Sequence, residues 1–206
     1  MKLHYELIKT NNSYLSETIK LYKDTIPSVF CYELIDWFEK SKTFRIDDHR
    51  KQSTELQIIG DPRPEAEQYR KLLFDYLHPL GERYEKDMHN LCHKDYKPQD
   101  KPLSKAFKTG FRSLQIQKYS SNDKGYPAVH IESGPMHTQK YLAVILYLNT
   151  VIDSGETVFP MAGTAIEPEI GAVVVFPTGI PFYHCGNPSK SDKYILTSWF
   201  EFMKYS

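Results

Sequence analysis

Apolar residues recur with a helical period in the first hundred residues of this 206-residue chain. One helix is predicted to begin near Ser28, because apolar side chains then return every three or four positions. A longer helix is predicted from the segment after Pro64 to about Met88, with Pro79 as a point where it can kink or split. Such faces usually pack on a sheet. The two faces consist of Phe30, Leu34, Ile35, Trp37 and Phe38, and of Tyr69, Leu72, Leu73, Tyr76 and Leu77.

From residue 111 onward the period changes to that of β-strands. Runs rich in β-branched and aromatic residues, separated by Gly, Pro, Asn or Ser, cover 111–119, 141–149, 157–159, 163–166, 172–176 and 193–202. Short strands preceded by helices predict an α+β fold, a double-stranded β-helix (a cupin-like jelly roll) whose N-terminal helices buttress one sheet. We expect a single domain over 1–206, with a mainly helical part (1–110) and a jelly-roll core (111–206) that carries the chemistry.

Composition and charge narrow the choice of partners. The chain has 26 basic and 26 acidic residues, so its formal net charge is zero. Neither nucleic acid nor an anionic membrane would be attracted to such a chain by bulk charge, and we expect neither as a partner. With 15 Tyr and 11 Phe, the chain is typical of a packed domain rather than a disordered one.

The cysteines and the N-terminus indicate a cytoplasmic protein. Cys31, Cys92 and Cys185 are odd in number and lack Cys-x-x-Cys spacing, so they suggest neither a disulfide framework nor a zinc ribbon. The N-terminus has no apolar signal segment, and no apolar run reaches transmembrane length.

Three residues in the strand-rich half form a candidate metal site: His130 and Glu132, two positions apart, and the distant His184. Alternate residues on a strand point to one face, so His130 and Glu132 can face the same interior. Two imidazoles and a carboxylate make the ligand set of a non-haem Fe(II) oxygenase, whereas a structural zinc site would want thiolates or a fourth ligand. His137 is an alternative proximal ligand, but no acidic residue accompanies it at the same spacing, which favours His130.

Lys193 follows His184 by nine positions and shares one strand face with Ile195, Thr197 and Trp199. If this face lines the interior, the Lys193 ammonium is a buried cation that needs an anionic partner. A dicarboxylate bound to the metal at one end would place its far carboxylate there. Taken alone, Lys193 would be interpreted as a surface lysine on an edge strand, and its position after His184 is what favours the ligand-binding interpretation.

Two further features have two interpretations each. Tyr147 can donate its hydroxyl to the same far carboxylate, or it can be a core tyrosine, and the residues favour neither. The Lys-rich stretch from Lys94 to Arg112 is typical of a solvated loop. The alternative is a lid that helps to hold an acidic or peptide substrate, because long loops in compact domains are often functional.

These motifs together resemble the prolyl 4-hydroxylase-type 2-oxoglutarate- and Fe(II)-dependent oxygenases. The resemblance is specific because the Gly-Glu-Thr-x-Phe-Pro stretch occurs together with both metal motifs. The opening helix around 30–35 also looks like that of the family. The matching stretches lie between Gln115 and Phe200, at 115–119, 125–132, 147–149, 155–160, 171–176 and 184–199.

By this resemblance, three residues would bind Fe(II) and four would bind 2-oxoglutarate. Lys193, with help from Tyr147 and Thr197, would hold the C5 carboxylate, and Tyr119 would lie near the metal-chelating end. The chain departs from the family at one ligand, because Glu132 stands where the family has Asp. The spacing from Tyr126 to His130 is also one residue longer than is usual in the family, which leaves the role of Tyr126 open. The implied ligands are His130, Glu132 and His184 for iron, and Lys193, Tyr147, Tyr119 and Thr197 for the co-substrate.

The resemblance implies an enzyme that hydroxylates an unactivated C–H bond. Its cofactors would be Fe(II), O2 and 2-oxoglutarate as co-substrate, with ascorbate as an optional reductant, and its by-products succinate and CO2. A prolyl residue in a peptide or protein is the implied substrate, and a free amino acid or other small molecule is the alternative, since a fold does not determine a substrate. The sequence leaves the substrate and the oligomeric state open.

Two other classes of function fit the same three ligands. One is a cupin-like module that binds a metal or a ligand without turnover, and the other is a zinc hydrolase with a metal-bound water. Lys193 and the stretch from Gly155 to Thr157 favour the oxygenase, because neither alternative needs a cation nine residues after the last ligand.

Overall fold

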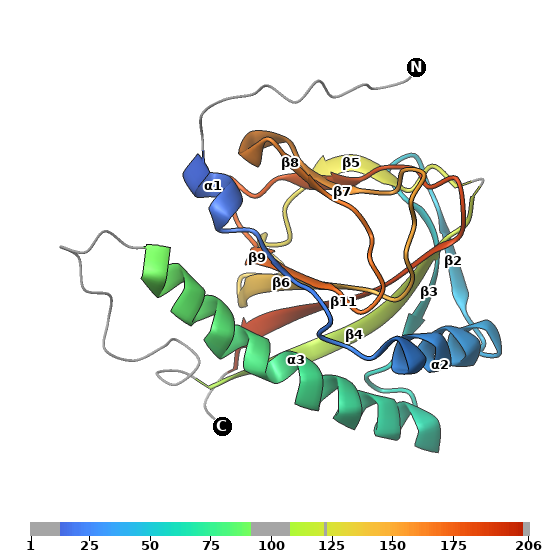
Figure 1. Ribbon diagram of the computed structural model, residues 1–206. Helices are drawn as coiled ribbons and strands as arrows, with labels where there is room; N and C mark the ends of the chain where they lie inside the picture. The colour runs from blue at the N-terminus through green and yellow to red at the C-terminus, as the bar shows by residue number, and fades with distance from the viewer. Residues whose placement is uncertain (1–12, 92–107, 122, 204–206) are drawn as a thin grey trace.

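The computed structural model describes residues 13–91, 108–121 and 123–203 (Figure 1). Its helices are α1 (Ser13–Glu17), α2 (Ser28–Glu39) and α3 (Pro64–Leu91), and a 3-10 turn covers Pro160–Ala162. Both predicted helices are present. Pro79 lies inside α3, which continues through it as one helix and does not split. Most of the Lys-rich stretch falls in residues 92–107, which lie outside the described residues. Arg112 at its end belongs to a strand.

Eleven strands in the described part of the chain form two antiparallel sheets. The larger sheet has the order β1-β9-β6-β11-β4-β3-β2 and the smaller one the order β5-β10-β7-β8. The strands of the larger sheet are β1 (Lys20–Tyr22), β2 (Phe44–Asp47), β3 (Gln52–Gln57), β4 (Thr109–Tyr119), β6 (Lys140–Tyr147), β9 (Val173–Pro177) and β11 (Lys193–Phe202). Those of the smaller sheet are β5 (Tyr126–His130), β7 (Thr157–Phe159), β8 (Thr164–Ile166) and β10 (His184–Gly186).

Helices α2 and α3 cover the outer face of the larger sheet, and the smaller sheet lies over its inner face (Figure 1). The outer core is formed by alternate strand residues packed against the two helices, as strand geometry requires. Gly81 of α3 allows this close approach, because a Cβ there would lie 2.9 Å from the ring of Phe200 on β11. Prominent members of this core are Leu34, Phe38, Leu73, Leu77, Leu114, Ile116, Val144, Leu146, Val175 and Leu196.

The intervening strand residues form a second core between the two sheets. It is apolar where β6 and β9 face the smaller sheet, through Ile145, Val174 and Phe176 among others. On β4 and β11 the inner face is instead largely polar and carries Gln115, Gln117, Tyr119, Lys193 and Thr197. The face predicted to join Lys193, Ile195, Thr197 and Trp199 therefore does line the interior. The change from apolar to polar residues leaves a cavity at one end of the sandwich.

The α+β jelly-roll prediction, with helices on one sheet, is confirmed, but five strands were not predicted. Strands β1 and β10 have only three residues each, and neither contains the β-branched residues of the equally short β7 and β8. Strands β2 and β3 form a hairpin of mostly polar residues that extends the larger sheet through pairing with β4. Strand β5 carries Pro127 and Ala128 and lacks a clear pattern. Backbone pairing, rather than side-chain periodicity, creates these strands.

Cys31 and Cys185 are both buried free thiols, and Cys92 lies outside the described residues. No described helix is both long enough and apolar enough to span a membrane.

Candidate metal centre and its cavity

Two strands of the smaller sheet place three candidate ligands together. His130 is the last residue of β5 and His184 the first residue of β10, and the two are paired across this antiparallel ladder. Glu132 follows β5 by two positions, and its backbone N–H donates to the Thr178 carbonyl at 3.1 Å. The chain is therefore fixed on both sides of the site, by the ladder and by the loop after β9.

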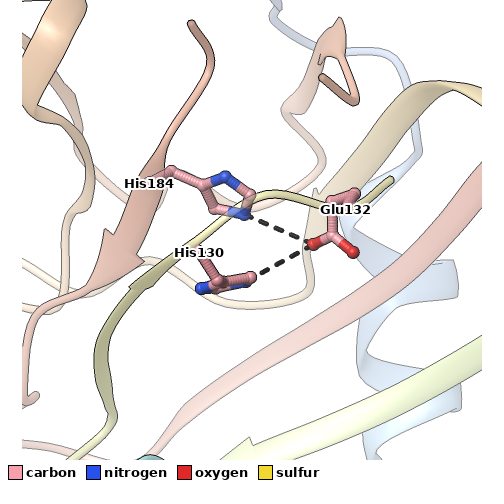
Figure 2. Close-up of side chains that lie close together, drawn as sticks. All are labelled: His130, Glu132 and His184. Carbon is pink, nitrogen blue, oxygen red and sulfur yellow. Dashed lines mark ion pairs between the residues drawn. The ribbon is translucent and has the colours of Figure 1, made fainter. Parts of the chain in front are cut away.

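The three side chains converge on one point (Figure 2). Glu132 Oε1 lies 3.3 Å from His184 Nε2 and 3.6 Å from His130 Nε2. One ligand atom from each residue lies within 4.8 Å of the others, a spacing at which the three can hold a metal ion. Among the described residues, no other group of His, Cys, Asp and Glu has this arrangement.

Backbone carbonyls determine which imidazole nitrogens face the site. His130 Nδ1 lies 2.8 Å from the Ala128 carbonyl oxygen, and His184 Nδ1 lies 3.1 Å from that of Phe182. A carbonyl only accepts hydrogen bonds, so each Nδ1 carries a proton and Nε2 is the nitrogen that faces Glu132. Metal-binding histidines in proteins are commonly oriented in this way.

The Glu132 carboxyl is ionised in this setting. Its burial by itself raises the pKa, but hydrogen bonds from His130 and His184 and their positive field outweigh burial and hold the pKa of Glu132 well below its usual range. The site thus offers one anionic oxygen and two imidazole nitrogens without needing to release a proton from the carboxyl. This donor set fits Fe(II) and contains no thiolate.

Aromatic rings enclose the two histidines. Tyr126 stacks on His130 with ring centroids 4.0 Å apart and an interplanar angle of 15°. Phe176 meets His184 edge to face at 4.8 Å, and Phe159 lies on the same ring at 5.6 Å. These contacts limit rotation of both imidazoles. The structure thus gives Tyr126, whose role the sequence left open, a contact with one of the candidate ligands.

A cavity of about 330 Å³ opens from this centre along the inner face of β11 and β4. Lys193 lines it and is only 3% exposed. Its Nζ donates to the Gly155 carbonyl at 2.6 Å. Burial lowers the pKa of Lys193 to about 8, and the field of Glu156 opposes this shift only in part. A buried ammonium without a carboxylate in contact fits an anionic ligand.

The other predicted co-substrate residues differ in their positions. Thr197 lines the cavity and accepts a hydrogen bond from Gln117 Nε2 at 3.1 Å. Tyr119 also lines it, but its hydroxyl donates to Gln117 Oε1 at 2.7 Å, and its ring lies 5.6 Å from Lys193 Nζ. The ring of Tyr119 therefore lies beside the candidate anchor for the far carboxylate, and the charge of Glu132 also acts on its hydroxyl, so its place near the metal-chelating end stays a prediction.

Tyr147 is fully buried and does not line the cavity. Its hydroxyl donates to Thr157 Oγ1 at 2.8 Å, and Thr157 is the residue that reaches the cavity wall. These contacts are those of a core tyrosine that orients a neighbouring hydroxyl, and the role of Tyr147 in binding the co-substrate stays a prediction. His137 lines the cavity as well but does not belong to the group of three ligands.

Sequence reasoning missed a hydrogen-bond network on the cavity floor. The Glu55 carboxylate on β3 is buried and accepts from Ser53 Oγ and Gln115 Nε2, both at 2.6 Å, and it forms an ion pair with Lys51. Gln117 Nε2 continues the network by donating to Gln115 Oε1 at 3.2 Å. The pattern of alternating polar residues on β3 and β4 was the available signal, and it was passed over because β3 was not predicted.

Comparison with a family model identifies the region that surrounds this centre. Residues 114–201 match the model described as 2OG-Fe(II) oxygenase superfamily. This confirms the resemblance inferred from the motifs. The search of curated proteins gives no significant match.

Solved structures extend the likeness to most of the chain. A prolyl-4-hydroxylase from Pseudomonas putida is 15% identical, with a TM-score of 0.65 over 91% of this chain and 94% of that one. A prolyl hydroxylase from Trichoplax adhaerens in complex with a peptide fragment of the hypoxia inducible factor oxygen degradation domain is 14% identical, with a TM-score of 0.62 over 91% and 84%. The viral collagen prolyl hydroxylase of Paramecium Bursaria Chlorella virus-1, in its 2OG complex, is 18% identical, with a TM-score of 0.56 over 91% and 97%. At such identities these matches establish the fold.

Proposed function

We propose that this chain, whose residues 114–201 belong to the 2OG-Fe(II) oxygenase superfamily, hydroxylates a prolyl residue of a peptide or protein. The enzyme is an Fe(II)- and 2-oxoglutarate-dependent dioxygenase. When bound, iron, O2 and 2-oxoglutarate together supply the oxidising chemistry that replaces an unactivated C–H bond by C–OH, with release of succinate and CO2. The protein supplies the ligands, the anchor and the shielding from water.

One observation carries this proposal: the three candidate ligands and a buried ammonium that no carboxylate contacts line the same cavity. His130, Glu132 and His184 leave coordination positions open when they hold a metal on one side. Lys193 supplies the opposite charge for the far carboxylate of a metal-bound dicarboxylate. Thr197 has its hydroxyl proton free to donate to the same ligand, because its oxygen accepts from Gln117.

The choice of a prolyl substrate is supported by the structural likeness. The three structures described above are prolyl hydroxylases by name, and one holds a peptide. A free amino acid or another small molecule is the second candidate, because the cavity itself carries no feature that requires a peptide.

Two functions from other classes explain fewer features. A zinc hydrolase uses the three ligands but has no task for a buried lysine on β11. A binding module without turnover does not need the open metal positions. Neither alternative requires the buried cation that lines the same cavity as the candidate ligands.

We also propose a reducing compartment, such as the cytoplasm, as the location of the protein. The two described cysteines, Cys31 and Cys185, are free thiols, which is typical of such a compartment.

The test is succinate formation from 2-oxoglutarate by the purified protein. We expect turnover only when Fe(II), 2-oxoglutarate and O2 are all present, and stimulation when a proline-containing peptide is added. Replacement of Fe(II) by Zn(II) should abolish it. Turnover with Zn(II) but without O2 would point to the hydrolase, and binding of 2-oxoglutarate without any succinate would point to the binding module.

A further inference from the structure

The cavity extends well beyond the anchor at Lys193. Lys193 and Trp199 lie six residues apart on the same face of β11, which corresponds to roughly 20 Å along an extended strand. Lys140, the first residue of β6, also lines the cavity and lies over Trp199. If 2-oxoglutarate binds at Lys193, the part of the cavity around Lys140 and Trp199 remains for the substrate.

The Lys140 ammonium is held in place but has no anionic partner in contact. Its Nζ lies 3.4 Å from the centroid of the Trp199 ring, a cation–π contact that fixes its position. Among residues 13–91, 108–121 and 123–203, no ion pair or hydrogen bond involves this Nζ atom. Burial lowers its pKa, and the more distant Glu132 and Glu201 oppose the shift only in part.

A second donor beside it also lacks an acceptor. The indole Nε1 of Trp199 is buried and has no hydrogen-bond partner within the described part of the chain. Buried donors are nearly always paired in folded proteins, so this unpaired N–H, on a residue that lines the cavity, fits an acceptor that a bound ligand would bring. The two donors, one charged and one neutral, are suited to an acceptor with two oxygens.

The charges around the cavity single out Lys140. Lys51, another cavity lysine, is neutralised by its ion pair with Glu55. Lys193 has its place at the far carboxylate of 2-oxoglutarate in the proposed function. Lys140 is then left as a cavity lysine with no carboxylate in contact in a partly buried site, which is costly unless the substrate neutralises it.

We propose that Lys140 and Trp199 form an anion subsite, and that the substrate carries a carboxylate close to the carbon that is hydroxylated. This inference rests on the proposed function and specifies its substrate class. Two sources of the carboxylate are chemically equivalent at this site: the α-carboxylate of a free or C-terminal amino acid, and the side chain of Asp or Glu next to the reacting residue of a peptide.

The experiment compares probes that differ only in charge. N-acetyl-L-proline is matched with N-acetyl-L-prolinamide, and the blocked peptide Ac-Glu-Pro-Glu-NH2 with its Gln and Lys counterparts. Binding to the Mn(II)- and 2-oxoglutarate-loaded protein is measured by calorimetry under nitrogen, and stimulation of succinate formation is measured with Fe(II) in air. We expect at least one anionic probe to bind about tenfold or more tightly than its neutral twin. The N-acetylproline pair and the peptide set distinguish the two sources.

Variants of Lys140 assign the effect to this residue. Lys140→Met should remove the preference for the anionic probe, and Lys140→Arg should keep it. Lys140→Glu should reverse the preference in favour of the cationic peptide Ac-Lys-Pro-Lys-NH2, because a carboxylate at this position attracts cations and repels anions. Lys124→Met, at an exposed position outside the cavity, is the matched control and should keep the wild-type preference.

Each outcome decides one of two questions. If the wild-type protein neither binds nor turns over 2-oxoglutarate, the proposed function fails. If 2-oxoglutarate is consumed but no anionic probe is preferred, or if Lys140→Met keeps the preference, the anion subsite is wrong while the oxygenase stands.

Discussion

The two sheets enclose the same cavity, but they are stabilised in different ways. The seven-stranded sheet is packed between α2, α3 and the inner core, and its long strands β4 and β11 pair over most of their length. The four-stranded sheet has strands of three to five residues, and the two long helices of the described part of the chain, α2 and α3, lie on the other sheet (Figure 1). The metal-ligand candidates belong to the small sheet, and the candidate anchor of the co-substrate belongs to the large one.

This division separates stability from chemistry. Replacing a side chain of the helix-packed core should destabilise the protein strongly, because burial there is nearly complete. Replacing a ligand on the small sheet should remove function while the large sheet keeps the fold intact. The variants below test whether the two sheets are independent in this sense.

The largest effect is expected for His184→Ala. It removes one of the three ligands, so Fe(II) binding should weaken strongly and succinate formation should be abolished. Circular dichroism and the unfolding midpoint should stay close to wild type, because the residue contributes little to the helix-packed core. Near-wild-type turnover would show that His184 is not a ligand. His49→Ala, at an exposed position on the β2–β3 connection, is the histidine control and should keep full activity.

The second effect is on stability. Leu196 on β11 is fully buried in the outer core, and Leu196→Ala should lower the free energy of unfolding by about 2–5 kcal/mol. Ile166→Ala on β8, at the edge of the small sheet, should cost about 1 kcal/mol or less, because its side chain is only partly buried. Urea unfolding of both variants without metal gives the comparison. Equal losses would mean that the two sheets contribute equally to stability.

The third effect concerns Lys193, the candidate co-substrate anchor on the large sheet. Lys193→Ala removes a charge-assisted contact worth roughly 1.5–3 kcal/mol, so the apparent KM for 2-oxoglutarate should rise about ten- to a few hundred-fold. Fe(II) affinity measured without co-substrate should change little. Lys190→Ala, three residues earlier and exposed, is the matched control and should behave as wild type. The reverse result would mean that Lys190, and not Lys193, holds the co-substrate.

The sequence predicted the long strands of the large sheet and the grouping of the three candidate ligands better than the shape of the cavity. Long alternating runs such as 193–202 are visible in a sequence because every second residue is buried, and β11 was predicted with its observed bounds. The ligands were visible because their chemistry is rare and their spacing matches strand geometry. Thr157 and Gln117 were missed because each depends on a partner from another strand, Tyr147 in one case and Tyr119 in the other. Contacts of this kind depend on the register between neighbouring strands, which cannot be derived from the sequence alone.

The smallest effect is expected from pH, and it acts on the same lysine. Burial lowers the pKa of Lys193 to about 8, so the ammonium that attracts 2-oxoglutarate is present below pH 8 and is lost above it. The apparent Kd for 2-oxoglutarate should therefore be flat up to about pH 7.5 and weaken about tenfold between pH 7 and 9. Calorimetry with Mn(II) under nitrogen measures this. A Lys193→Arg variant should lose the pH dependence, because its guanidinium stays protonated throughout this range.

The lowered pKa of Lys193 makes the stability of the ligand-free protein change with pH in the opposite direction to the affinity for 2-oxoglutarate. Between pH 8 and the ordinary lysine value near 10.5, the unfolded chain keeps a proton that the folded chain has lost. The unfolded state then binds more protons, so the contribution of Lys193 to stability should rise with pH over this interval. If the affinity for 2-oxoglutarate falls while the free energy of unfolding rises, both changes can be assigned to the Lys193 ammonium. If both fell together, the loss of affinity would instead reflect general alkaline unfolding, and the large sheet would be less robust than its packing indicates.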